Sequence, residues 1–232
     1  MPFRFSITGE VDPFALFKDQ GEEDLGFWWA SQFNQQYDDL LAQLASDQPR
    51  DPPESWWEKW GTALTIGMIP IMLNFAEIAI QENATGFSAV AIDWNRVIGE
   101  ATNWADTYSF GMVKDVNAIS QANLQEQLRL FYNNQLSLKD MKANLLPIFG
   151  PVRAAAIATT ETTRGFERGQ DILEEHLKQS GVLTDRQWFT EPGACAICAP
   201  NEGKFRDRDG WTTSGAPAHP NCRCWTVLAQ RV

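Results

Sequence analysis

Four cysteines and one histidine near the C-terminus have the types and spacing of metal ligands. Cys195 and Cys198 are separated by two residues, so both thiols can bind one ion from a tight turn. His219, Cys222 and Cys224 follow further along the chain. Thiolates and imidazole favour zinc or an iron–sulfur cluster over magnesium or calcium. Tetrahedral zinc takes four ligands at about 2.0–2.3 Å, so the pattern predicts a zinc site with one ligand more than the ion requires.

The surplus ligand leaves a choice open. If the segment from Cys222 onwards is a strand, Cys222 and Cys224 point to the same face, and either can join Cys195, Cys198 and His219. Four protein ligands leave no coordination position for a substrate, so we expect the zinc to be structural. The alternative interpretation is that the four cysteines are free or disulfide-bonded and that the histidine is incidental.

A second distinctive run, Thr160–Gly169, lies in an expected helix. Glu161 and Arg164 fall on one stripe of that helix. Gly165 and Gly169 fall on the neighbouring stripe, and two glycines inside a helix cost about 1 kcal/mol each relative to alanine. Their presence indicates that another backbone passes close by. The charged stripe is either a docking face for the zinc lobe, held by Glu161 and Arg164, or a solvated row of ion pairs.

The elements that position these residues are expected to be mostly helices. Apolar residues spaced three and four apart, together with capping and breaking residues, predict helices over Glu22–Ser46, Ser55–Asn83, Gly86–Tyr132 (as one helix or two), a short stretch from Ser137, and Pro151–Gly181. Turn residues dominate afterwards, with short strands expected at Arg186–Thr190 and Cys224–Leu228. The expected fold class is α+β and predominantly helical, with a small C-terminal zinc-knuckle lobe over about residues 186–232.

Charge and aromatic residues divide the chain into two unlike halves. The net charge is −11, with −12 in residues 1–115 and +1 in the remainder, and seven of the ten tryptophans precede residue 105. An acidic first half is unsuited to wrapping DNA, because phosphate binding requires positive charge. We therefore expect residues 1–118 to form an acidic, Trp-rich helical region that binds a partner, and residues 119–232 to form a second domain.

The densest aromatic cluster is Trp56, Trp57 and Trp60, which would make one broad apolar face on a helix. That face either closes the core of the first half or enters a pocket on another protein, since large rings often anchor interfaces.

Two segments bear on membranes and secretion. Gly61–Ala76 has no charged side chain, but it is shorter than the roughly 20 residues of a membrane span and it contains Pro70. We expect a buried helix there and no stable membrane span. Residues 1–20 lack the apolar run of a secretory signal, and clustered cysteines without such a signal favour metal binding over disulfides.

The order of these motifs resembles the C-terminal domain of the phage Mu F-like minor head proteins, also called head morphogenesis proteins. The resemblance covers about residues 119–232. It is carried, in order along the chain, by Thr160–Arg164, Gln187–Thr190, Cys195–Cys198, Asn201–Lys204 and Ala218–Cys224. One departure is that Glu191–Ala194 stands where the family usually has an Asp-rich turn.

The resemblance implies a structural protein of a tailed bacteriophage rather than an enzyme. Members of this family are present in few copies per particle, associate with the portal, and enter the capsid during assembly. The implied location is therefore the virion interior near the portal, and the host cytoplasm during assembly. The implied partners are the portal protein and other phage head proteins, with packaged DNA as a further partner of some members. The implied cofactor is structural zinc.

Two alternatives stay open at the level of the sequence. One is a zinc-supported enzyme, such as a nuclease or transferase, although the chain lacks a P-loop, a G-x-S-x-G and an H-E-x-x-H motif. The other is a zinc ribbon that binds DNA. Its basic and aromatic side chains would be Lys204, Arg206, Arg208, Arg223, Trp211 and Trp225.

Overall fold

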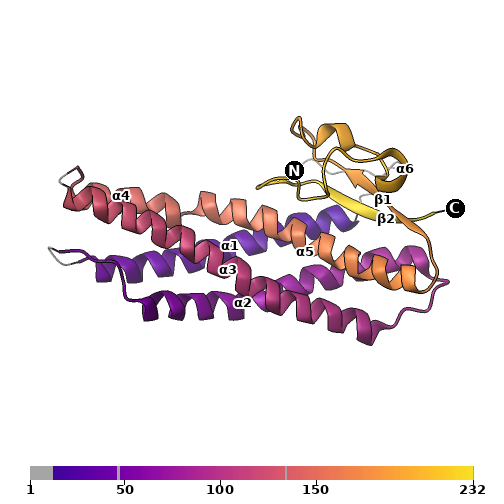
Figure 1. The fold of residues 1–232 in the computed structure, drawn as a ribbon, viewed down its shortest axis with the longest axis horizontal. Helices are drawn as coiled ribbons and strands as arrows, with labels where there is room; N and C mark the ends of the chain where they lie inside the picture. Colours follow the sequence, from indigo (N-terminus) through magenta and orange to yellow (C-terminus); the bar gives the residue numbers. More distant parts are fainter. Residues whose placement is uncertain (1–12, 46–47, 134, 232) are drawn as a thin grey trace.

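The computed structural model describes residues 13–45, 48–133 and 135–231. Long helices lie side by side along the long axis of the molecule (Figure 1): α1 (Pro13–Gln43), α2 (Glu54–Ala84), α3 (Trp94–Tyr132) and α5 (Pro151–Gln179). Short elements link them: η1 (Thr85–Phe87), α4 (Leu138–Leu145) and η2 (Leu146–Phe149). A small lobe sits on one end of this bundle, built from β1 (Thr184–Phe189), η3 (Ala199–Asn201), α6 (Arg206–Asp209) and β2 (Trp225–Gln230).

The predicted class of fold is therefore confirmed in its main features, a mostly helical chain with two short strands near the C-terminus. Most helix bounds agree with the apolar pattern to within a few residues. The first helix is an exception, because it begins at Pro13 rather than at Glu22. Gly21 lies inside it, where an added Cβ would sit 2.7 Å from Cε1 of Phe75. This glycine allows a close contact and does not mark a helix boundary.

The third predicted helix begins later than expected. Residues between Phe87 and Asp93 are not helical, and α3 starts at Trp94 with Asp93 as its N-cap. The Oδ1 atom of Asp93 accepts a hydrogen bond from the backbone N–H of Arg96, which satisfies one of the free donors at the helix start. The short helix α4 begins as predicted, because Oγ of Ser137 accepts from the backbone N–H of Asp140.

The bundle core is continuous across the boundary predicted at residue 118. That position falls in the middle of α3, and both α1 and α2 pack directly on α5. One buried apolar cluster includes Leu25 and Trp60 from the first half together with Phe166 and Trp225 from the second. In the described part of the chain, the acidic first half therefore shares its core with the second half.

The tryptophan cluster belongs to this core. Trp56, Trp57 and Trp60 are 7%, 4% and 8% exposed. The Nε1 atoms of Trp56 and Trp60 donate to Oδ2 of Asp39 at 3.0 and 3.1 Å, and Nε1 of Trp57 donates to Oδ1 of Asp51 at 3.3 Å. These partners satisfy the polar edges of the buried rings. Because the rings are covered by the chain's own helices, their burial favours the core interpretation over a face that enters a pocket on another protein.

The close approach predicted from the glycines of α5 is confirmed, and the neighbour is α2. A Cβ on Gly169 would lie 2.3 Å from the carbonyl oxygen of Ala76, and one on Gly165 would lie 2.7 Å from Cβ of Phe75. Neither distance is compatible with a side chain. The two glycines therefore let α2 and α5 pack with their backbones nearly in contact.

One segment, Glu54–Phe87, is long and apolar enough to cross a membrane by length and composition. Its most apolar stretch has a mean hydropathy of 1.8, and 39% of that stretch is buried inside the protein. The core helix of a soluble bundle meets the same criteria, so this is weak evidence for a span. The absence of a stable span stays a prediction.

The lobe contains an antiparallel pair of strands. Trp188 of β1 stands opposite Thr226 of β2, and Arg186 stands opposite Leu228. The free edge of β2 is turned toward the bundle. There, Nε2 of Gln170 donates to the carbonyl of Thr226, and the backbone N–H of Leu228 donates to Oδ1 of Asn83. Helix side chains thus satisfy an edge that would otherwise be unpaired.

Candidate metal centre

The first two candidate ligands lie on a tight turn of the lobe. The backbone N–H groups of Cys198 and Ala199 both donate to the carbonyl of Cys195, at 3.1 and 2.9 Å. Gly193 precedes this turn with φ at 80°, a conformation that favours glycine. Cys195 is exposed and Cys198 is 1% exposed. The turn presents both sulfurs on the same side, as the two-residue spacing predicts.

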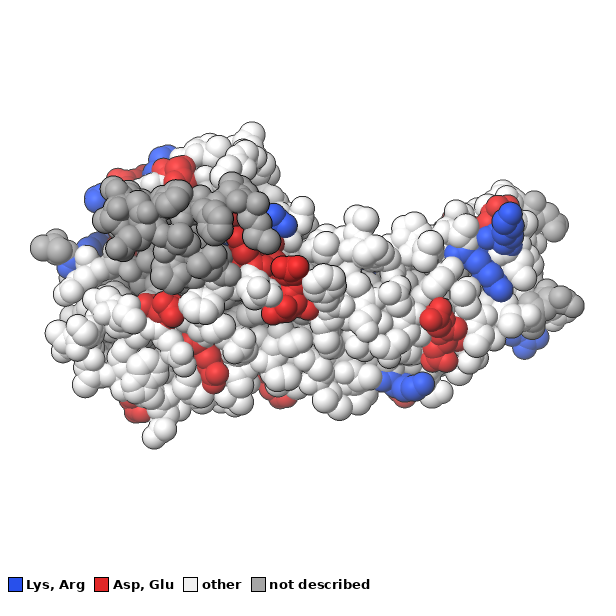
Figure 2. Space-filling view, turned by 180° about the vertical axis from the view of Figure 1, so that it is seen from behind, with Lys and Arg blue, Asp and Glu red and all other residues white. Residues whose placement is uncertain are grey.

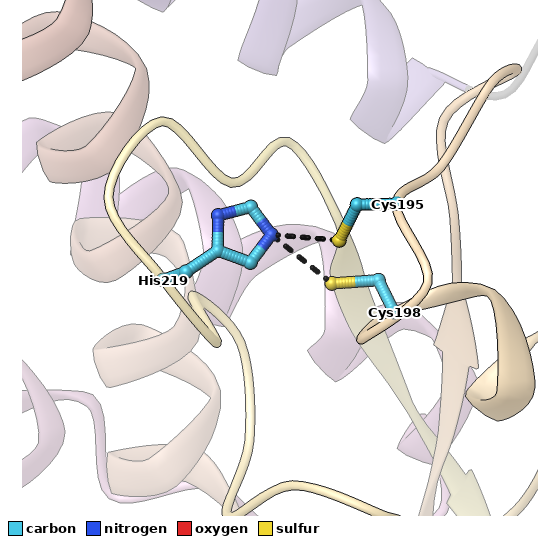
Figure 3. Close-up of side chains that lie close together, drawn as sticks. All are labelled: Cys195, Cys198 and His219. Carbon is cyan, nitrogen blue, oxygen red and sulfur yellow. Dashed lines mark hydrogen bonds between the residues drawn. The ribbon is translucent and has the colours of Figure 1, made fainter.

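The histidine faces these sulfurs (Figure 3). Its Nε2 atom lies 3.1 Å from Sγ of Cys195 and 3.5 Å from Sγ of Cys198. Its Nδ1 atom lies 2.8 Å from the carbonyl oxygen of Pro220, which can only accept, so Nδ1 carries a proton. In the neutral ring, the lone pair of Nε2 is directed at the cysteines. A backbone acceptor on the second ring nitrogen is a common arrangement for a metal-binding histidine.

The remaining cysteines approach from the segment that precedes β2. Sγ of Cys222 lies 3.7 Å from Sγ of Cys198, and both residues are 1% exposed. Sγ atoms of Cys198, Cys222 and Cys224 all lie within 4.8 Å of one another. The strand expected at Cys224–Leu228 begins one residue later, at Trp225, so neither Cys222 nor Cys224 lies in β2. The two cysteines nevertheless face the same cluster.

All five predicted ligands are therefore brought together, as two overlapping groups. One group is Cys195, Cys198 and His219, and the other is Cys198, Cys222 and Cys224. The shared member is Cys198. The cluster can hold a metal ion.

The distances can be compared with those of a tetrahedral zinc site. With zinc–ligand bonds of about 2.3 Å to sulfur and about 2.05 Å to nitrogen, the tetrahedron has edges of about 3.8 Å between sulfurs and about 3.5 Å between sulfur and nitrogen. The separation between Cys198 and Cys222 is 3.7 Å, and that between Cys198 and His219 is 3.5 Å. These two edges fit, and the 3.1 Å edge from Cys195 to His219 is short.

The pKa values of the four thiols are shifted in opposite directions, so the sulfurs differ in how readily they ionise. A hydrogen bond from the Cys224 thiol lowers the pKa of Cys222 despite its burial, and the same bond raises the pKa of the donor, Cys224. Backbone N–H groups lower the pKa of Cys195, and burial raises that of Cys198. Four thiolates this close would repel one another, so some of the thiols keep their protons in the absence of a cation. A bound cation would replace those protons, because metal ions bind the thiolate form.

Helix α5 supplies polar side chains that contact the backbone around the metal ligands. Oγ1 of Thr160 accepts from the N–H of Asn221 at 2.8 Å, and Oγ1 of Thr163 donates to the carbonyl of Cys222 at 3.0 Å. One to two turns further on, the carboxylate of Glu167 accepts from both the N–H and the hydroxyl of Thr226, each at 2.7 Å.

These docking residues were not identified from the sequence as contacts of the lobe. Together with Gln170 they follow the spacing i, i+3, i+7 and i+10, which places them on one stripe of α5: Thr160, Thr163, Glu167 and Gln170. The signal available was the pair of threonines in the middle of a helix, where β-branched residues have no propensity advantage.

The predicted charged pair has a different neighbour. Nη1 of Arg164 lies 2.6 Å from Oε1 of Glu161, and the hydroxyl of Tyr108 on α3 donates to Oε2 of Glu161 at 2.6 Å. Arg164 also bonds the same hydroxyl. Burial raises the pKa of Glu161. In the described part of the chain, the hydrogen bonds and the ion pair of these two residues therefore link α5 to α3 and do not reach the lobe.

Three of the four basic residues expected to form a DNA-binding patch, its arginines, are paired with carboxylates. Arg206 pairs with Glu174 and Asp207. Arg208 pairs with Asp209, and Arg223 pairs with Glu22 of α1 at 3.1 Å. Trp225 is 3% exposed and so unavailable for stacking on bases. On the face shown in Figure 2, basic residues occur in small separate groups, and acidic residues gather at the foot of the lobe.

Comparison with known proteins gives no relative, because no protein-family model, curated protein or solved structure matches the chain. The resemblance to the Mu F-like proteins therefore rests on the sequence motifs alone.

Proposed function

We propose that this chain is a structural minor head protein of a tailed bacteriophage. It would associate with the portal and be packaged inside the head, and its C-terminal lobe would be stabilised by one zinc ion. It would be non-catalytic. Its partners would be the portal protein and other head proteins, and it would pass from the host cytoplasm into the virion during assembly.

The observation that carries this proposal is the contact between two motifs that lie far apart in the chain. The resemblance rests on the run Thr160–Arg164 and on the run Ala218–Cys224. In the fold, Thr160 bonds Asn221 and Thr163 bonds Cys222, so the two runs meet at the cysteine and histidine cluster. Two motif segments that form one unit are better explained by a shared domain than by chance similarity.

The chemistry of the donors supports zinc as the ion. Three or four thiolates with one imidazole form a soft, compact set, which suits zinc better than oxygen-preferring cations. His219 and the cysteines around Cys198 can fill all four positions of a tetrahedral ion. A filled coordination sphere supports a structural role, because a catalytic zinc keeps one position for water or substrate.

The pairing of basic side chains favours the head-protein function over a DNA-binding ribbon. Arg206, Arg208 and Arg223 each already have a carboxylate partner. Phosphate would have to displace those carboxylates, so the lobe offers little of the free positive charge on which DNA affinity depends.

The test is co-expression with the portal protein encoded in the same genome. The expected result is that the chain elutes with the portal ring in size-exclusion chromatography and is found in purified heads in a few copies. Separate elution, together with heads that lack the chain, would refute the proposal. Elemental analysis of the same preparation should give about one zinc per chain, and a metal-free sample with four titratable thiols would refute the zinc assignment alone.

A further inference from the structure

Two threonine side chains of helix α5 bond to the backbone of the segment from His219 to Cys222, and not to the side chains of the candidate ligands. Thr163 is fully buried, and its hydroxyl donates to the carbonyl of Cys222, which is itself a candidate ligand. The hydroxyl of Thr160, one turn earlier, accepts the N–H of Asn221. The two threonines therefore bond to the peptide groups on either side of the Asn221–Cys222 pair, the one that precedes Asn221 and the one that follows Cys222.

The backbone conformation of this pair of residues needs support. Asn221 has φ at 61°, in the left-handed region that non-glycine residues rarely adopt. Such a residue persists when its surroundings hold it there. It lies between His219 and Cys222, so its conformation decides whether the imidazole and the sulfur converge on Cys198.

We propose that Thr160 and Thr163 are positioning residues of the metal site, and that metal binding and docking of the lobe on α5 are coupled. This inference rests on the zinc part of the proposed function. The threonines hold the segment from His219 to Cys222 in the shape that brings its ligands toward Cys198. By linkage, an ion that requires this shape also favours the docked lobe, and the coupling is reciprocal.

The experiment measures zinc affinity of the full-length chain by competition with a chromophoric chelator. Thr163→Val keeps the shape of the side chain and removes the donor to Cys222. Loss of outer-shell partners typically weakens metal binding by about 10–100-fold, and we expect a weakening in that range. Thr163→Ser retains the hydroxyl and should bind zinc within about threefold of the wild type.

The matched control is Thr162→Val on the same helix. Thr162 is also fully buried, but its hydroxyl has no hydrogen-bond partner among the described residues. Its replacement removes a buried hydroxyl without touching the lobe, so zinc affinity should not change. A merely structural effect of placing valine in this part of α5 would lower affinity in both variants.

A second measurement tests the reciprocal direction. Hydrogen exchange at the amide of Asn221, which bonds to Thr160, should accelerate when a chelator removes zinc from the wild type. In Thr163→Val, the same exchange should already be fast with zinc present, while the helices of the bundle keep their protection.

If Thr163→Val fails to fold, Thr160→Val tests the same idea from a less buried position. A folded Thr163→Val or Thr160→Val chain with wild-type zinc affinity would overturn the proposal. A chain that binds zinc with this dependence but does not join the portal would leave the coupling intact and refute only the head-protein function.

Discussion

Gly169 provides a direct test of how closely α2 and α5 pack. We predict that Gly169→Ala destabilises the protein although alanine is the better helix former. The new Cβ would lie 2.3 Å from the carbonyl oxygen and 2.9 Å from the carbonyl carbon of Ala76. Ordinary contacts of this kind are about 1 Å longer, and the obstacle is backbone that cannot rotate away. The two helices would have to separate along their contact.

The magnitude follows from two opposing effects. Overpacking of a close-packed core costs about 1–3 kcal/mol, and a clash with backbone belongs at the upper end of that range. The gain in helix propensity is about 1 kcal/mol. The expected net loss in the free energy of unfolding is therefore about 2 kcal/mol.

The matched control is Gly99→Ala in α3. Gly99 is exposed, and an added Cβ there would meet nothing within 4 Å. Only the propensity gain remains, so this variant should be more stable than the wild type by up to about 1 kcal/mol. Urea denaturation followed by circular dichroism measures both changes. If Gly169→Ala is stabilised as much as Gly99→Ala, the close approach of α2 to α5 is wrong.

Two further perturbations test the core and the docking of the lobe. Trp57→Ala combined with Trp60→Ala should lower the free energy of unfolding by at least about 3 kcal/mol, because both rings are buried; a double variant that unfolds at the wild-type urea concentration would contradict the core assignment. For Glu167, burial raises the pKa to about 7, and since its unfolded pKa is near 4.5, the native state holds the proton more tightly. Stability from this group is thus present below about pH 4.5 and is lost as pH rises through 7, by on the order of 3 kcal/mol. The free energy of unfolding of the zinc-loaded wild type and of Glu167→Gln, measured between pH 5 and 8, checks this. The wild type should lose stability relative to Glu167→Gln as pH rises, and a constant difference between the two would refute the reasoning.

Much of the bundle could be predicted because its helices are amphipathic. Apolar residues such as Leu25, Trp29 and Phe33 recur at the helical period, and each is buried. The missed part of α1 shows the limit of this reasoning. Gly21 has the same sequence signal whether it ends a helix or admits the ring of Phe75, and only the tertiary contact distinguishes the two.

The candidate site was predictable in its ligands but not in its support. Ligand spacing is local, so Cys195, Cys198 and the histidine could be identified without knowing the fold. The threonines of α5 bond to backbone groups about sixty residues away, and a backbone acceptor leaves no signature in the sequence. For the same reason Glu161, a charged residue in a distinctive motif, was a more obvious docking candidate than Thr163.

The composition of the lobe explains why it needs both a metal and a helix. Its own buried cluster consists of Trp188, Cys198, Cys222 and Cys224, so three of its four core residues are candidate metal ligands. A core this small supplies little stabilisation by burial, and small domains usually add a metal or disulfides. The remaining contacts reach outward to the bundle: Trp225 packs in the bundle core, and polar groups bond to α5 and α2, including the carboxylate of Glu167. The order of the lobe should therefore depend on the ion and on the bundle together, so that losing either one loosens the other.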